Sequence, residues 1–249
     1  MIALLSGDGK ARFVAGVDGC KKGWVVVLLQ LNGEDIAGEF CRVFDSFAKA
    51  IEMPEAPRYV GVDVPIGLPV LAIPGGRACD REARKMLGRK RGSSVFAPPV
   101  RAALAADSYE RAVALNRASS KHGIGISKQV YGLLPKLREV HDALSPDLQL
   151  RIREVHPELS FATMNSGEPM SHSKKSKAGY EERLEQLEVY FPEVRGALEC
   201  TTSRAVGRDD VLDAYAAAWT AWRMARGKAH YVPQTPELDS RGLRMGIWY

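Results

Sequence analysis

The sequence has few cysteines, and none of them is spaced for a metal knuckle. Its 249 residues contain four, all far apart and without a Cys-x-x-Cys pair: Cys20, Cys41, Cys79 and Cys200. Zinc knuckles need closely spaced ligands, and small disulfide scaffolds need a much higher cysteine density. Both classes are therefore disfavoured, and we expect a reducing, cytoplasmic location.

Long apolar runs and the common enzyme fingerprints are also missing. No apolar run approaches the roughly 20 residues that cross a bilayer. The opening segment MIALLSGDGKAR has an early acid and no long apolar core, unlike a signal peptide. The absence of a P-loop and of GxGxxG, GxSxG and HExxH motifs disfavours the enzymes that need them. We expect no membrane partner and, without repeats or low-complexity segments, a single domain over residues 1–249.

The charge composition leans mildly toward polyanionic partners. Lysine and arginine number 35 against 30 acidic residues, which gives a net charge of +5. Such a balance is compatible with nucleic acid but is weak evidence by itself. The sequence leaves the oligomeric state open, a homodimer included.

The most informative stretch is residues 13–31, FVAGVDGCKKGWVVVLLQL. Two apolar runs flank a glycine-containing turn, which predicts a β-hairpin with Asp18 at the end of its first strand. Residues 36–43 predict a third strand, which completes an antiparallel meander. A helix capped by Asp45 or Ser46 and a strand over 59–64 follow, and the crossover makes that fourth strand parallel to the first.

The remainder predicts a helical insertion and a return to the sheet. Residues 65–148 contain Pro/Gly-rich loops and several helical patterns, including 108–121 and 127–144. Alternation over 150–156 predicts another strand, with Glu154 and His156 on one side. Further expected elements are a short helix from Pro157, a polar, basic and mobile loop over 166–178, helices over 179–190 and 209–226, and an edge strand in the tail GLRMGIWY.

Four carboxylates fall at positions that the predicted topology can bring together. Asp18 and Asp63 end parallel strands, while Asp210 and Asp213 are neighbours on one face of the last helix. Clustered carboxylates repel one another and need a hard cation to remain ionised together. The pattern indicates Mg²⁺ or Mn²⁺ as cofactor, and a pair of such ions could hydrolyse a phosphodiester.

Four motifs then resemble a known family: VAGVDGCKKGW, GVDVPIGLP, REVHPELSF and DDVLDAYAAAW. Together they are similar to domain of unknown function 429, an uncharacterised family of predicted nucleases. The resemblance implies an α/β, ribonuclease H-like fold, whose mixed five-stranded sheet joins an antiparallel three-stranded meander to parallel strands, with flanking helices. In Holliday-junction resolvases of that superfamily the metal ligands come from the first strand, the fourth strand and the last helix. By that pattern the matching ligands are Asp18, Asp63, Asp210 and Asp213.

Other polar residues carry both a functional and a structural interpretation. Glu154, which has no simple counterpart in those resolvases, is a further catalytic candidate or an ion-pair partner of a nearby arginine. His156 and Glu158 are candidate acid or base residues, and His156 could equally be structural. Asp209 is best explained as a first-turn helix residue that favours the helix dipole. Candidate phosphate contacts are Lys21, Lys22, Arg89, Lys90, Arg91, Lys174 and Lys175.

The leading hypothesis is a metal-dependent nuclease, a hydrolase that cleaves phosphodiester bonds in nucleic acid. Phosphoryl transfer or nucleotide binding of the actin and sugar-kinase type is an alternative, because VDGCKKGW could cradle phosphates. Those proteins carry two copies of the fold, and this chain is too short for two. A non-catalytic binding protein that retains the carboxylates is a third interpretation.

Overall fold

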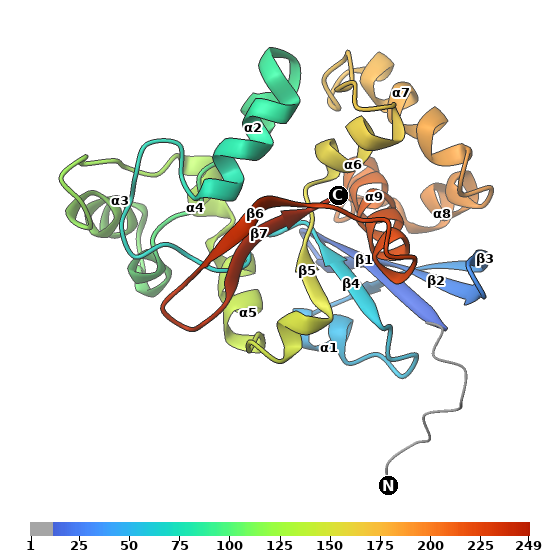
Figure 1. The fold of residues 1–249 in the computed structure, drawn as a ribbon, viewed down its shortest axis with the longest axis horizontal. Coiled ribbons are helices and arrows are strands. Elements are labelled where there is room, and N and C mark those ends of the chain that lie inside the picture. The colour runs from blue at the N-terminus through green and yellow to red at the C-terminus, as the bar shows by residue number, and fades with distance from the viewer. Residues whose placement is uncertain (1–11) are drawn as a thin grey trace, which may run out of the picture.

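The computed structural model, which describes residues 12–249, is organised around a five-stranded mixed sheet (Figure 1). The strand order is β3-β2-β1-β4-β5. Strands β1 to β3 form an antiparallel meander, β4 is parallel to β1, and β5 is parallel to β4. The predicted ribonuclease H-like sheet is therefore confirmed. Its strands are β1 (Phe13–Cys20), β2 (Gly23–Asn32), β3 (Asp35–Phe44), β4 (Tyr59–Val62) and β5 (Ile152–Glu154).

The first hairpin extends further than its sequence predicts. The β1–β2 ladder continues to the Cys20–Gly23 pair, so only Lys21 and Lys22 form the turn. Asp18 is thus within β1, opposite Val25, rather than where the strand ends. Gly23 makes this tight reversal feasible, because its φ of +148° is one that other residues rarely adopt. The missing side chain also lets β3 approach, since a Cβ on Gly23 would lie 1.9 Å from the Phe44 carbonyl oxygen.

Helix α9 (Arg208–Ala225), predicted over 209–226, crosses one face of the sheet at unusually close range. A Cβ on Gly16 of β1 would lie 2.0 Å from the Ala218 nitrogen, and one on Gly61 of β4 would lie 2.6 Å from the Ala217 oxygen. The two glycines therefore let the helix backbone rest directly on the strands. This contact sets which α9 residues reach the edge of the sheet.

Replacement of Gly16 by alanine should lower the free energy of unfolding by about 3 kcal/mol, because the methyl group forces α9 away from β1. Gly38→Ala is a matched control, since Gly38 is also in a strand but its Cβ would approach nothing closer than 3.4 Å. Urea denaturation of both variants measures the difference. Equal effects of the two substitutions would contradict the close-packing argument.

Helices cover both faces of the sheet. On the α9 face, α7 (Lys177–Glu188) and α8 (Val194–Thr201) add Leu184, Leu187 and Leu198 to a core with Val25 and Val27. The opposite face is covered by α1 (Phe47–Ile51) and α5 (Leu134–Ala143). The side chain of Ser46 caps α1 by accepting from the Lys49 N–H. Of the two predicted caps, Asp45 and Ser46, the structure therefore confirms Ser46.

The segment 65–148 contains four α-helices and also contributes to the core. They are α2 (Ala78–Arg91), α3 (Tyr109–Ala118), α4 (Lys128–Gly132) and α5. Leu134, Leu137 and Val140 of α5 are buried with the sheet residues of one face. In Figure 1, α3, α4 and α5 lie to the left of the main sheet, and α2 lies above them. None of the helices within residues 12–249 is both long and apolar enough to span a membrane.

The chain after α5 differs from prediction in three places. Leu150, predicted in a strand, belongs to a 3₁₀ turn and is exposed, so β5 is only three residues long. Helix α8 and strand β6 (Tyr231–Leu238) were not predicted; two prolines within β6 obscure its pattern. The tail strand β7 (Arg244–Trp248) pairs with β6 in a separate two-stranded sheet rather than at the main edge, although Trp248 bridges to Val155.

Candidate metal centre

Three aspartates from three elements meet at the end of the central strands. Asp18 is in β1, Asp63 directly follows β4, and Asp213 is in α9. Each offers a carboxylate oxygen, and these oxygens lie within 4.8 Å of one another. The Asp63 N–H donates to the Val17 carbonyl at 2.9 Å, which extends the β1–β4 pairing up to the cluster. Rigid backbone therefore holds two of the three carboxylates in register.

Lys174 adds a positive charge to this aspartate cluster. Its Nζ lies 2.5 Å from Asp213 Oδ2. The segment that carries it, predicted to be mobile, has several anchors: Glu182 accepts from the Ser171 and His172 N–H groups at 2.7 and 3.0 Å, and Met170 is buried. These contacts position Lys174 over the carboxylates. Helix α6 (Pro157–Met164), with the predicted Pro157 in its first turn, borders the same region.

Burial and mutual repulsion strongly perturb the acids of the cluster. Burial, together with the Asp63 and Asp213 charges, raises the pKa of Asp18 well above its ordinary value. Burial and then Asp213 raise the pKa of Asp63 to about 8, while Lys174 opposes the increase. The Asp213 charge in turn raises the pKa of Lys174. A divalent cation among the carboxylates would relieve this repulsion.

Asp210 lies beside the cluster, but its carboxylate is not among the three that come within 4.8 Å of one another. It is the third residue of α9, and its Oδ2 accepts the Gly207 N–H at 2.8 Å. Burial raises the pKa of Asp210 to about 6, although that hydrogen bond lowers it. Asp210 and the three clustered aspartates line one cavity of 190 Å³. The structure thus brings together three of the four predicted ligands and gives the fourth a helix-capping contact.

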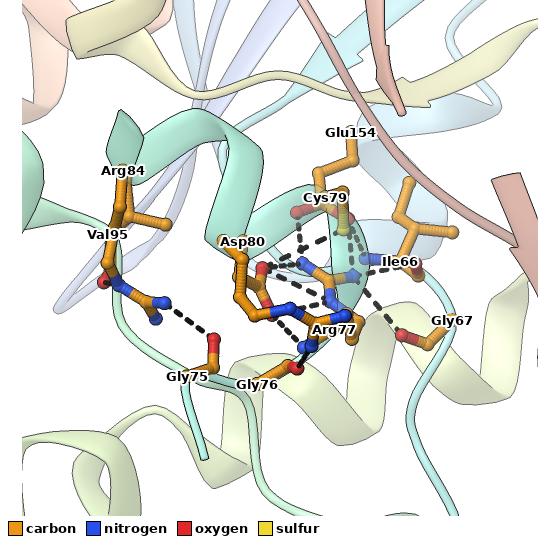
Figure 2. A network of polar contacts seen from close by, with 11 residues as sticks. Ile66, Gly67, Gly75, Gly76, Arg77, Cys79, Asp80, Arg84, Val95 and Glu154 are labelled. Atoms are coloured by element: carbon orange, nitrogen blue, oxygen red, sulfur yellow. Dashed lines mark hydrogen bonds and ion pairs between the residues drawn. The ribbon is translucent and has the colours of Figure 1, made fainter. Parts of the chain in front are cut away.

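Glu154 lies in a separate buried ion network rather than in the aspartate cluster (Figure 2). Both of its carboxylate oxygens accept from the Arg77 guanidinium, at 2.6 and 2.7 Å, and Oε2 also accepts the Ile66 N–H at 2.7 Å. Arg77 is 2% exposed and also contacts both Asp80 oxygens. Burial raises the pKa of Glu154, with Arg77 opposing. The arginine partner is therefore neither Arg151 nor Arg153, the two arginines beside Glu154 in the sequence.

His156 and Glu158 lie at the junction of β5 and α6. Burial lowers the pKa of His156, and its Nδ1 has no hydrogen-bond partner. Glu158 is 6% exposed; one of its oxygens lies 2.5 Å from Arg183, whereas Oε2 has no partner. Both side chains line a second cavity, of 440 Å³, which also includes Asp63, Asp213 and Lys174. They therefore face the space next to the aspartate cluster.

The predicted phosphate contacts are spread over different surfaces. Lys21 and Lys22 are exposed in the β1–β2 turn, and Arg89 and Lys90 are exposed at the end of α2. Arg91 and Lys175, in contrast, line the 440 Å³ cavity, where Arg91 also donates to the Met170 carbonyl at 2.8 Å.

Sequence reasoning missed two cations near the site, Arg77 and Lys136. Lys136 of α5 lines the 190 Å³ cavity and donates to the Gly23 carbonyl at 2.8 Å. For Arg77 the available signal is Asp80 three residues later, a spacing typical of a helix start.

The aspartate cluster lies within a region shared with other proteins. A family model described as "Protein of unknown function (DUF429)" matches residues 16–238, which include Asp18, Asp63, Asp213 and Lys174. Comparison with curated proteins gave no match, and comparison with solved structures gave none either. The match spans most of the chain, from the middle of β1 to the end of β6. The chain therefore belongs to the DUF429 family, whose description assigns no function.

Proposed function

We propose that the protein is a metal-dependent nuclease that hydrolyses phosphodiester bonds in nucleic acid. The observation that carries the proposal is the convergence of Asp18, Asp63 and Asp213 at the edge of a ribonuclease H-like sheet. Carboxylate oxygens are the ligands that hard divalent cations prefer, so the donor set fits Mg²⁺ or Mn²⁺. The pKa of Asp63, raised to about 8 by burial and then by the Asp213 charge, supports the fit, because a bound cation would offset both the lost hydration and the repulsion.

Charge balance favours one divalent cation together with Lys174 over the expected pair of cations. Three ionised carboxylates carry three negative charges, and Lys174 supplies one positive charge at 2.5 Å from Asp213. One divalent cation then makes the centre neutral. Asp210, the fourth ligand that a pair would use, is engaged with the Gly207 N–H. When bound, the cation would polarise the phosphodiester and lower the pKa of a coordinated water.

The protein's own residues would then orient the substrate and move a proton. The Lys174 ammonium, held by Asp213, can donate to a phosphate oxygen beside the cluster. Burial keeps the pKa of His156 below its ordinary value, so the ring is neutral near pH 7 and its unpartnered Nδ1 can accept a proton. His156 is thus the better-placed base, since Glu154 is engaged with Arg77.

The first test is cleavage of a panel of single-stranded, duplex and branched DNA and RNA in Mn²⁺, Mg²⁺ or EDTA. We expect cleavage by the wild-type protein that requires a divalent cation, and a loss of at least about 100-fold in Asp213→Asn. Asp209→Asn is the matched control, because Asp209 is on the same helix but outside the cluster. Cleavage that persists in EDTA, or that Asp213→Asn leaves intact, would reject the proposal.

A further inference from the structure

The 440 Å³ cavity beside the aspartate cluster has the features of a built binding site. It lies between the end of α2, the β5–α6 junction and the loop that carries Lys174 and Lys175. Six of its lining residues, among them Asp63, Asp213 and Lys174, also line the smaller cavity of the aspartate cluster. A ligand in the larger cavity would therefore have one end next to the carboxylates and the Lys174 ammonium.

Two residues that line this cavity, His156 and Glu158, each have one buried polar atom without a hydrogen-bond partner within the protein. Glu158 is 6% exposed, and its Oε2 makes no hydrogen bond although the other oxygen is paired with Arg183. The His156 Nδ1 also makes none. A buried carboxylate oxygen without a donor is costly, and a ligand hydroxyl or amino group that reached Glu158 from the cavity would relieve that cost.

The remaining walls combine cationic and neutral polar groups. Arg91 and Lys175 supply positive charge, and Ser93, Ser94 and Gln129 supply hydroxyl and amide groups. Arg77, Asp80 and Glu154 also line the cavity, but they satisfy one another. A ligand that suits this set has an anionic part and several hydrogen-bonding groups, as a nucleotide does.

The size of the cavity restricts the form of nucleic acid that can enter. Its 440 Å³ falls within the range of about 300–1,000 Å³ for small-ligand pockets. A cubic space of 440 Å³ is under about 8 Å across, whereas a single groove of B-DNA is already about 12 Å wide. A duplex therefore cannot enter the cavity. One unpaired nucleotide is the largest nucleic-acid unit that this space suits.

We propose that the cavity between α2, the β5–α6 junction and the 173–175 loop binds a single unpaired nucleotide. Its phosphate would lie toward Lys174 and Lys175, and its sugar or base would donate to Glu158. The inference rests on the proposed nuclease function for its biological meaning, and it narrows the substrate to nucleic acid with unpaired nucleotides. Mononucleotide binding, however, can be measured without any cleavage.

Isothermal titration calorimetry with AMP and dAMP, in the presence of Mn²⁺, tests the cavity directly. We expect Ser94→Trp, which fills the cavity from an exposed position, to weaken binding at least 10-fold, and Lys175→Ala to weaken it about 10-fold. Lys85→Ala is the control, since Lys85 is an exposed lysine of α2 outside the cavity lining, and should change affinity less than twofold. Thermal melting verifies that each variant is folded.

The outcomes separate this inference from the proposed nuclease function. Mononucleotide binding that Ser94→Trp abolishes, while Mn²⁺ affinity stays within twofold, supports the cavity even if no cleavage is found. Failure of both nucleotides to bind the folded wild-type protein would overturn the inference, even if cleavage is observed. Binding unaffected by both cavity substitutions would also overturn it.

Discussion

Asp63→Asn is expected to weaken metal binding at least about 100-fold and, at the same time, to stabilise the metal-free protein. The pKa of Asp63 is raised to about 8 by burial and by Asp213. The folded state therefore keeps a proton that the unfolded state loses near pH 4, and the wild-type protein loses stability as pH rises from about 4 to about 8. Asparagine has no proton to lose and acquires no charge as the pH rises, so it removes this penalty.

The size of the effect depends on pH and on metal. At pH 8 in EDTA we expect the variant to exceed the wild-type free energy of unfolding by at least about 2 kcal/mol, and at pH 5 by much less. Saturating Mn²⁺ should stabilise the wild-type protein, by about 2.7 kcal/mol at 100 times its Kd, but leave the variant unchanged.

Chemical denaturation at both pH values gives the stabilities, and calorimetry gives the Mn²⁺ affinity and stoichiometry. The expected values are one Mn²⁺ per wild-type chain and an affinity at least about 100-fold lower in Asp63→Asn, because even indirect changes around metal ligands cost 10–100-fold. Asp209→Asn should bind like wild type. A variant that is less stable than wild type in EDTA at pH 8, or that binds Mn²⁺ normally, would disprove this account of Asp63.

Arg77→Ala is expected to be the most destabilising substitution near the site. Arg77 is 2% exposed and contacts both oxygens of Asp80 and of Glu154, together with the Ile66 and Gly67 carbonyls (Figure 2). Its removal leaves two carboxylates buried together without a counter-charge, which costs about 3–5 kcal/mol. Lysine cannot serve all these acceptors at once, so Arg77→Lys should recover only part of the loss.

A matched control and a rescue separate charge compensation from simple packing. Arg84→Ala, in helix α2 that begins directly after Arg77, removes hydrogen bonds to the Gly75 and Val95 carbonyls and should cost about 1 kcal/mol. Adding Asp80→Asn and Glu154→Gln to Arg77→Met should restore much of the stability, because no buried charge then remains. Equal losses in Arg77→Ala and Arg84→Ala would contradict the network's importance.

Glu154→Gln as a single substitution decides the role of Glu154. If this residue only holds the loop after Asp63 through the Ile66 N–H, a folded Glu154→Gln variant should keep Mn²⁺ binding and metal-dependent cleavage. Loss of cleavage without loss of stability would return Glu154 to the catalytic candidates.

Local sequence patterns determined the sheet and two of the three clustered aspartates. The apolar runs, glycine turn and crossover helix sufficed to predict that β4 is parallel to β1; the structure confirms this and pairs the two strands directly, so Asp18 and Asp63 reach the same edge. The amphipathic pattern of α9 likewise predicted a long buried helix. These features follow from periodicity and turn chemistry, which act over a few residues.

Only the tertiary structure decided which polar residues join the cluster. The contact of α9 with Gly16 and Gly61 sets the rotation and height of the helix, so Asp213 reaches Asp18 while Asp210 caps the helix instead. Lys174 comes from a loop 39 residues before Asp213, and Glu154 pairs with Arg77 across 77 residues of sequence. Such pairings leave no local signal, because they depend on where distant segments meet in the folded chain.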